Sequence, residues 1–234
     1  MPLYPSAEWM DEYARLLDAS EVLDDLADGW GVGFDGDILL VMSDLPLEET
    51  RLRDLPPAAL EGLSADTIEG VGDVSLADAP EQFGDALRPS LPAQVRELLG
   101  QIESKVVDGS VHAYLELEDG DCVGIEVLKS PAERDAAFTV RGSHETWQDI
   151  IDGRPPASAV LGGDLSIEGN RFRQLQYLAM FQYLGRVASE VETTCVFESP
   201  SFSPTTALLD EALRQPAFLH RTAQRHVNRT LNLL

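Results

Sequence analysis

The spacing of apolar residues near the start of the chain predicts two short helices. Over residues 6–18 the apolar positions recur at the spacing of one helical face; these positions are Trp9, Met10, Tyr13, Leu16 and Leu17. Ser6 can cap this first helix, because a serine hydroxyl accepts a backbone N–H of the first turn. Ser20 can cap a second helix that contains Leu23 and stops at Gly29.

Two stretches resemble pairs of β-strands, and each contains an Asp-Gly pair. Residues 30–42, WGVGFDGDILLVM, hold two apolar runs joined at 35–36, and residues 111–128 hold two runs joined at 119–120. Asp-Gly suits a type I′ turn because both central residues take positive φ. The sequence therefore predicts one β-hairpin in each stretch.

Residues 43–104 interrupt this pattern with prolines, short apolar clusters and many carboxylates. Such a composition indicates an insertion that is irregular and partly helical. At its end, residues 92–104 predict a helix started at Pro92, since proline suits the beginning of a helix. The apolar face of this helix comprises Val95, Leu98, Leu99 and Ile102.

Residues 136–187 contain the clearest succession of predicted elements. A strand over residues 136–142 is followed by a helix that Ser143 can cap and Gly153 ends. The apolar residues that this helix turns inward are Trp147, Ile150 and Ile151.

Two adjacent prolines, Pro155 and Pro156, preset the first turn of a short helix that ends at the glycines 162–163. Residues 164–169 predict a second strand. A long helix follows over residues 171–185, and its apolar stripe is too wide for one packing seam. The stripe comprises Phe172, Leu175, Leu178, Ala179, Phe181 and Leu184.

The net charge of the chain indicates the kind of cytoplasm in which the protein works. The 41 acidic residues exceed the 17 basic ones, which gives a net charge of −24. Such an acidic surface repels nucleic acid. The high carboxylate content, with Lys105 and Lys129 as the only lysines, predicts a halophilic, haloarchaeal-like protein in a cytoplasm at molar salt. The alternative is an ordinary acidic protein. No apolar run reaches the ~20 residues of a membrane span, and the acidic N-terminus is unlike a secretory signal. We expect a soluble, cytoplasmic protein.

Few residues suggest a catalytic, metal-binding or nucleotide-binding role. His144 and Glu145 start a predicted helix, where acidic residues favour the helix dipole, and His112 lies alone in a predicted strand. Cys122 and Cys195 lack CxxC spacing, so we expect core thiols, with a single disulfide as an open alternative. The G-x-G-x-x-G of residues 31–36 lies within a predicted hairpin and not between a strand and a helix, so nucleotide binding is not expected. No catalytic residue, metal or cofactor is predicted.

The succession in residues 136–187 resembles the type-two sterol carrier protein family. The residues that carry the resemblance are the W-x-x-I-I-D-G-R helix, the prolines after it, and G-G-D-L-S-I-E-G-N before the last helix. Members commonly show a tryptophan-bearing helix ending in a G-x-x-x-P turn, and a G-x-[LI]-x-[LIV]-x-G strand. The resemblance is looser over residues 30–42 and 111–128.

The resemblance implies an α+β fold, in which a curved, mostly antiparallel five-stranded sheet is backed by helices over a hydrophobic tunnel. Members bind fatty acids, acyl-CoA, sterols or other lipids without chemistry. We therefore expect a single domain over residues 1–199, with the insertion at 43–104, that binds or transfers a hydrophobic lipid of fatty-acyl or isoprenoid type. The apolar positions expected to line the tunnel are Phe138, Trp147, Ile151, Leu161, Ile167, Phe172, Leu175, Leu178 and Phe181.

The alternative function is a protein-interaction or homodimerisation module with the same fold and a filled core. A continuous apolar pocket of several hundred cubic ångströms, roughly the size of common ligand sites, would favour lipid. A packed interior would favour assembly.

Residues 200–234 form a predicted helical tail. No acidic residue follows Glu211, and four arginines give residues 212–234 a charge of +4; they are Arg214, Arg221, Arg225 and Arg229. An apolar face opposes the last three arginines and consists of Leu219, Ala223, Val227 and Leu231. We expect the tail to dock on an acidic patch of the same or a neighbouring subunit of a homo-oligomer, with a membrane-surface helix as the alternative.

Overall fold

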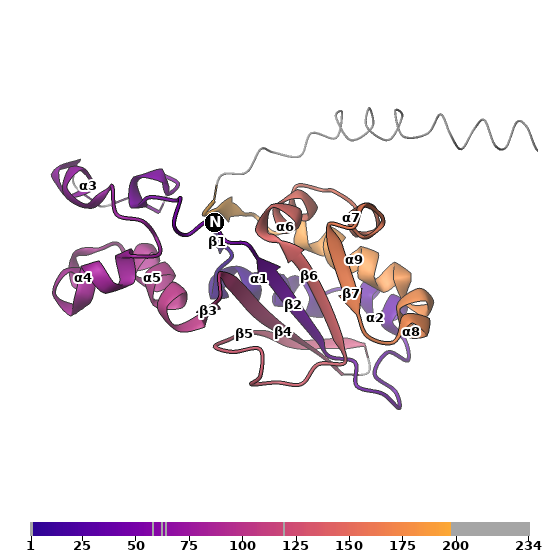
Figure 1. Cartoon of the computed structure of the whole chain (residues 1–234). Helices are drawn as coiled ribbons and strands as arrows, with labels where there is room; N and C mark the ends of the chain where they lie inside the picture. The colour runs from indigo at the N-terminus through magenta and orange to yellow at the C-terminus, as the bar shows by residue number, and fades with distance from the viewer. Residues whose placement is uncertain (1, 58, 62, 64, 119, 198–234) are drawn as a thin grey trace, which may run out of the picture. The chain divides into compact units, whose positions relative to one another are not determined.

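The computed structural model describes residues 2–57, 59–61, 63, 65–118 and 120–197. All of them lie in the first of the two units into which the chain divides, residues 1–199. The predicted tail over residues 200–234 lies outside the described residues. Within the first unit, a mixed sheet carries helices against one face (Figure 1).

The main sheet confirms the expected α+β class. In spatial order its strands are β7 (Leu165–Glu168), β6 (Phe138–Ser143), β2 (Ile38–Ser43) and β4 (Ser110–Glu118), followed along the far edge of β4 by β3 (Val106–Val107) and β5 (Asp121–Leu128). All neighbouring pairs are antiparallel except β2 and β6. The sheet has six strands where five were expected, because the two-residue β3 pairs with the start of β4.

The hairpin predicted over residues 30–42 is wrong. β2 lies at the centre of the sheet, between β4 and β6, and the residues before it form turns. The cause is Trp30, which is fully buried and whose Nε1 donates a hydrogen bond to the carbonyl oxygen of Gly36 at 2.7 Å. The segment therefore folds around the indole instead of pairing with β2.

The second predicted hairpin is confirmed by the pairing of β4 with β5. Gly120 has φ +97°, the positive region that the turn was expected to need. A Cβ at this position would lie 2.7 Å from the carbonyl oxygen of Ala27. Glycine is therefore required here both for the backbone conformation and for the close approach of α2.

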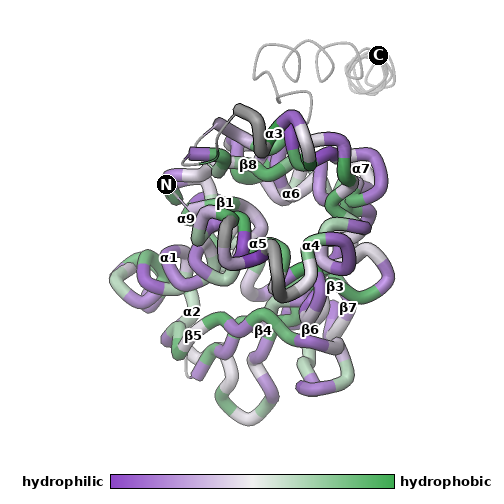
Figure 2. The backbone as a smooth tube through the Cα atoms, turned by 90° about the vertical axis from the view of Figure 1, so that its left-hand side faces the viewer, coloured by the Kyte–Doolittle hydropathy of each residue, from purple (hydrophilic) through white to green (hydrophobic). Residues whose placement is uncertain are grey.

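The first two helices begin where the serines predicted them. The Ser6 hydroxyl accepts the Trp9 N–H before α1 (Ala7–Asp18), and the Ser20 hydroxyl accepts the Leu23 N–H before α2 (Glu21–Ala27). Figure 2 shows hydrophobic and hydrophilic positions alternating around α1, as expected for a helix with one buried face. The strand β1 (Leu3–Tyr4) precedes α1 and forms a separate two-stranded parallel sheet with β8 (Thr194–Cys195).

The insertion is partly helical, as expected. Its elements are η1 (Leu52–Asp54), α3 (Ala65–Val71), α4 (Ala79–Leu87), η2 (Arg88–Ser90) and α5 (Ala93–Lys105). The predicted helix over residues 92–104 corresponds to α5, with Pro92 as its N-cap. The buried side chain of Gln101 joins α5 to the N-terminal segment, because it accepts the Ala7 N–H and donates to the Pro5 carbonyl, both at 3.0 Å.

The next two helices begin and end at the predicted residues, Ser143 and Gly163. The Ser143 hydroxyl accepts the Thr146 N–H and starts α6 (His144–Ile151). Gly163, at φ +85°, ends α7 (Pro156–Gly162). The glycine supplies the left-handed C-cap that side-chain-bearing residues rarely adopt.

The long helix predicted over residues 171–185 is two helices, α8 (Arg171–Gln176) and α9 (Leu178–Ala188), separated at Tyr177. Tyr177 is buried, its ring lies 5.0 Å from that of Trp30, and its hydroxyl donates to the Asp28 carbonyl at 3.2 Å. This inward anchor accounts for the break in the helix.

Successive side chains of β2 point to opposite faces of the sheet and belong to two different clusters of buried residues. Ile38, Leu40 and Met42 belong to the large cluster under the helices. Leu39 and Val41 belong to a small cluster on the other face, with Tyr114 and Leu128. The central strand is thus buried on both faces, and its even-numbered side chains point toward the helices that cover the sheet.

Candidate functional site

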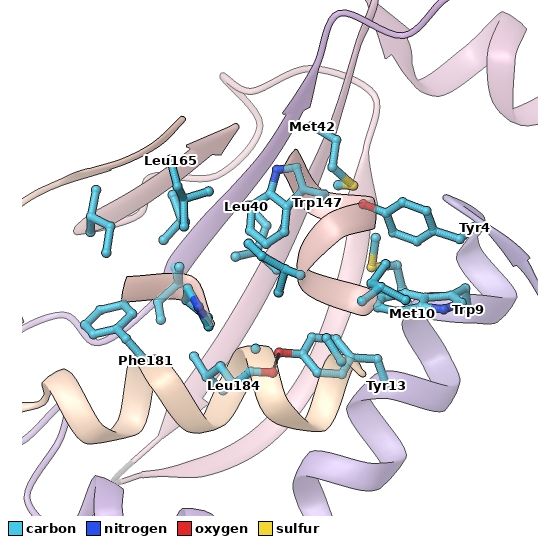
Figure 3. Close-up of a pocket in the computed structure, with 18 residues that line it drawn as sticks. Tyr4, Trp9, Met10, Tyr13, Leu40, Met42, Trp147, Leu165, Phe181 and Leu184 are labelled. Atoms are coloured by element: carbon cyan, nitrogen blue, oxygen red, sulfur yellow. Dashed lines mark hydrogen bonds between the residues drawn. The ribbon is translucent and has the colours of Figure 1, made fainter. Parts of the chain in front are cut away.

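A cavity lies between the sheet and the helices α1, α6 and α9 (Figure 3). Its volume is about 60 Å³, room for a few water molecules. Aliphatic and aromatic side chains form its wall, and the wall contains no charged residue. The site can therefore hold an apolar group.

The floor of the cavity comes from three strands. β2 contributes Ile38, Leu40 and Met42, β6 contributes Val140, and β7 contributes Leu165 and Ile167. The residues that share a strand lie two apart, so the alternation of the pleat places them on one face. The helices cover this floor with Trp9, Met10 and Tyr13 of α1, Trp147, Ile150 and Ile151 of α6, and Phe181 and Leu184 of α9.

Three of the four polar side-chain groups in the wall have protein partners. Trp9 Nε1 donates to Thr193 Oγ1 at 2.8 Å, and Trp147 Nε1 donates to the Val41 carbonyl at 2.9 Å. The Tyr13 hydroxyl donates to the Leu184 carbonyl at 2.8 Å. The fourth group, the hydroxyl of Tyr4, has no partner among the described residues.

Both tyrosines of the wall are neutral phenols. Burial, with a smaller contribution from Cys195, raises the pKa of Tyr4 well above its usual value. Burial also raises the pKa of Tyr13, with a smaller contribution from Cys122. Since neither phenol ionises near neutral pH, the wall presents no charge to a ligand.

Four of the nine predicted site residues line this cavity. They are Trp147, Ile151, Ile167 and Phe181. Each comes from an element that the sequence predicted, on the side that faces the sheet or the helices. Their contact with a lipid stays a prediction.

The other five predicted residues do not line the cavity. Phe138 is buried elsewhere, against the ring of Trp30 at 4.8 Å. Four side chains lie exposed on α7, α8 and the start of α9: Leu161 at 88%, Phe172 at 74%, Leu175 at 75% and Leu178 at 48%. The prediction assumed one continuous helix, whereas the break at Tyr177 lets only α9 turn residues such as Phe181 inward.

The sequence analysis missed the N-terminal contribution to the wall, which comprises Tyr4, Trp9, Met10 and Tyr13. The signal was present in the aromatic face of the first predicted helix. These residues were left out of the predicted site because the resemblance lay in the second half of the chain. Pairing of β1 with β8 brings this segment beside the C-terminal half.

The remaining candidates for chemistry are separate from the cavity. His144 is buried with its ring 5.7 Å from that of Phe197, and His112 lies in β4 on the other side of the sheet from the helices. Cys122 and Cys195 are free thiols, so the alternative of a disulfide between them is wrong. Within the described part of the chain, no group of His, Cys, Asp and Glu could hold a metal ion.

The fold and the cavity define a class, that of α+β proteins able to hold an apolar ligand. A comparison with family models then finds the SCP-2 sterol transfer family over residues 81–182. This match confirms the resemblance to the type-two sterol carrier proteins, a family of non-catalytic lipid carriers, and supports lipid binding or transfer as the general function. The matched residues exclude α1 and β2, which provide much of the wall.

Two solved structures are similar to this chain at 20% sequence identity. One is a crystal structure of sterol carrier protein 2, with a TM-score of 0.46, covering 79% of this chain and 95% of that one. The other is a solution structure of a conserved hypothetical protein from Thermus thermophilus, described as possibly a sterol carrier protein, with a TM-score of 0.47 and coverage of 81% and 90%. A comparison with curated proteins found no match. Among the described residues, no helix is long and apolar enough to cross a membrane.

Proposed function

We propose that this protein binds a hydrophobic lipid of fatty-acyl or isoprenoid type in the cavity between the sheet and α1, α6 and α9, and carries it without chemical change. The observation that supports the proposal is the uncharged apolar wall of this cavity, in a chain matched to the sterol transfer family. We place this activity in a single domain over residues 1–199.

Burial of an apolar chain supplies enough free energy for such binding. About 15 methylene groups at ~0.8 kcal/mol each contribute ~12 kcal/mol before the costs of ordering the ligand. An apolar wall needs few polar contacts to reach useful affinity. This explains how a carrier can function without a pattern of catalytic residues.

The cavity must widen to take such a chain. Its volume of about 60 Å³ is below the roughly 300–1,000 Å³ of common ligand sites. Met10 and Met42 lie in the wall, and their unbranched side chains can change rotamer at low cost. We therefore expect lipid entry to displace these side chains and to enlarge the space between α1 and β2.

The small volume also favours the second candidate function, a homodimerisation or protein-interaction module with a filled interior. The two functions differ in their response to lipid. A carrier binds lipid saturably as a chain of constant oligomeric state. An interaction module forms a concentration-dependent assembly and binds no lipid.

The direct test is native mass spectrometry of the full chain purified from its own host, followed by lipid extraction. We expect an added mass of one lipid per chain, and the same lipid in the extract. Absence of stoichiometric lipid, together with failure to bind any fluorescent fatty acid or isoprenoid probe, would contradict the carrier function. Light scattering of the same sample separates a carrier from an assembly module.

A further inference from the structure

The hydroxyl of Tyr4 is buried in the cavity wall without a hydrogen-bond partner among the described residues. The side chain is only 2% exposed. A buried polar atom without a partner loses its hydration without compensation, so native proteins rarely keep one without a reason. Tyr4 is also the one tyrosine of this wall in that condition, since the Tyr13 hydroxyl donates to the Leu184 carbonyl.

The position of the hydroxyl suggests a ligand atom as its partner. Figure 3 shows the Tyr4 side chain directed from β1 toward Met42 and Trp147, whereas Phe181 and Leu165 lie at the opposite end of the lining residues. The indole Nε1 of Trp147 is already engaged with the Val41 carbonyl. The protein therefore provides one hydroxyl for hydrogen bonding at one end of an otherwise apolar space.

The chemistry of the wall restricts the polar group that a ligand can place there. No lysine, arginine or histidine lines the cavity, so a carboxylate or phosphate would lose its hydration without a counter-charge. An alcohol, ester or ketone loses much less on burial and can pair with a phenol, which both donates and accepts. The wall is suited to a lipid whose single polar group is uncharged.

We propose that Tyr4 Oη hydrogen-bonds the uncharged oxygen of a long-chain alcohol or carbonyl lipid, with the apolar chain of that lipid extending toward Phe181. This assignment rests on the proposed function and names the ligand class within it. We expect free fatty acids and acyl phosphates to bind more weakly, because the same wall offers no counter-charge.

Two isosteric variants of the full chain test the assignment. Tyr4→Phe removes the unpartnered hydroxyl, and Tyr13→Phe removes a partnered hydroxyl from the same cavity as the matched control. In thermal unfolding of the ligand-free protein, we expect Tyr4→Phe to be as stable as wild type or more stable. Tyr13→Phe is expected to be less stable, because the Leu184 carbonyl loses its donor.

Binding is measured by calorimetry with hexadecanol, hexadecanoate and the alkane hexadecane. We expect hexadecanol to bind at least about tenfold more tightly than hexadecanoate near neutral pH, since only the carboxylate loses charge hydration. Tyr4→Phe should weaken hexadecanol about threefold to tenfold, the range for one hydrogen bond, and leave hexadecane unchanged. Equal binding of hexadecanol to wild type and Tyr4→Phe, or tighter binding of hexadecanoate, would overturn the assignment.

The two arms separate the ligand class from the carrier function. Binding of hexadecanoate alone would uphold the carrier function and overturn the role of Tyr4. Binding of none of the three probes would overturn both. Destabilisation of the ligand-free protein by Tyr4→Phe would show that the hydroxyl already has a partner, such as ordered water, and would also overturn the role of Tyr4.

Discussion

Two parts of the same interior differ in how well they are filled. Around Trp30, the rings of Phe34, Phe138, Tyr177 and Phe181 pack with centroids 4.8–5.6 Å from the indole. Between α1, α6 and the central strands, a mixed wall of aromatic and aliphatic side chains leaves a cavity of about 60 Å³. Both parts are equally apolar in sequence.

An apolar stripe in the sequence therefore does not by itself indicate a binding site. Four rings surround the Trp30 indole and fill the space at that end, whereas the rings of Tyr4, Trp9 and Tyr13 pack on one another and leave a gap beside them. Phe181 belongs to both parts, because it touches Trp30 and also lines the cavity. It forms the boundary between packed core and candidate site.

Removal of Trp30 should have the largest effect. Trp30→Ala is expected to lower the free energy of unfolding by about 3–5 kcal/mol, because it empties the centre of the packed part and leaves the Gly36 carbonyl without its donor. Ile151→Val, in the cavity wall, should cost only about 0.5–1.5 kcal/mol. Urea denaturation followed by circular dichroism measures both, and equal losses would mean that the two parts do not differ in packing.

Filling of the cavity should affect binding more than stability. Val140→Phe adds a ring on the cavity floor and should weaken lipid binding at least about tenfold, with a stability change under about 2 kcal/mol. The control is Val111→Phe, at a buried position of the same core cluster outside the cavity wall. This control should be destabilised more, by about 1–3 kcal/mol or beyond, and unchanged lipid binding by Val140→Phe would contradict the location of the site.

Stability should depend weakly on pH through His112, which lies in neither the packed part around Trp30 nor the cavity wall. Burial, and then Arg141, lowers the pKa of His112 below 6.5, so the unfolded chain takes up the proton first as pH falls. His112 therefore contributes stability above that pH that is lost on acidification. Between about pH 7.5 and pH 5.5 the wild type should lose unfolding free energy, and His112→Gln should lose less of it, by roughly 1 kcal/mol or less. A larger loss in the variant would contradict this sign.

Local signals predicted much of the fold. The hydroxyls of Ser6, Ser20 and Ser143 cap the helices that their positions indicated, since capping depends on a few neighbouring residues. The Asp-Gly rule succeeded for β4 and β5 and failed at residues 35–36. There the burial of Trp30, a long-range effect that spacing does not reveal, overrides the turn preference.

The site was harder to predict than the fold. Trp147 and Ile167 could be assigned because their elements flank the cavity in the family that the sequence resembles. Leu175 could not be excluded, because the break at Tyr177 depends on its contacts with Trp30 and Asp28, which lie far away in sequence. The orphan hydroxyl of Tyr4 depends equally on three-dimensional contacts, and no pattern in the sequence indicates it.

The most direct test of the central claim is the set of intermolecular NOEs between methyl-labelled protein and bound hexadecanol. If lipid occupies the cavity, its chain should show NOEs to the methyl groups of Met42 and Ile151, which line the wall, and its contacts should saturate at one lipid per chain. NOEs confined to the exposed Leu161 and Leu175, or no saturable contact, would contradict the proposal that this cavity carries lipid.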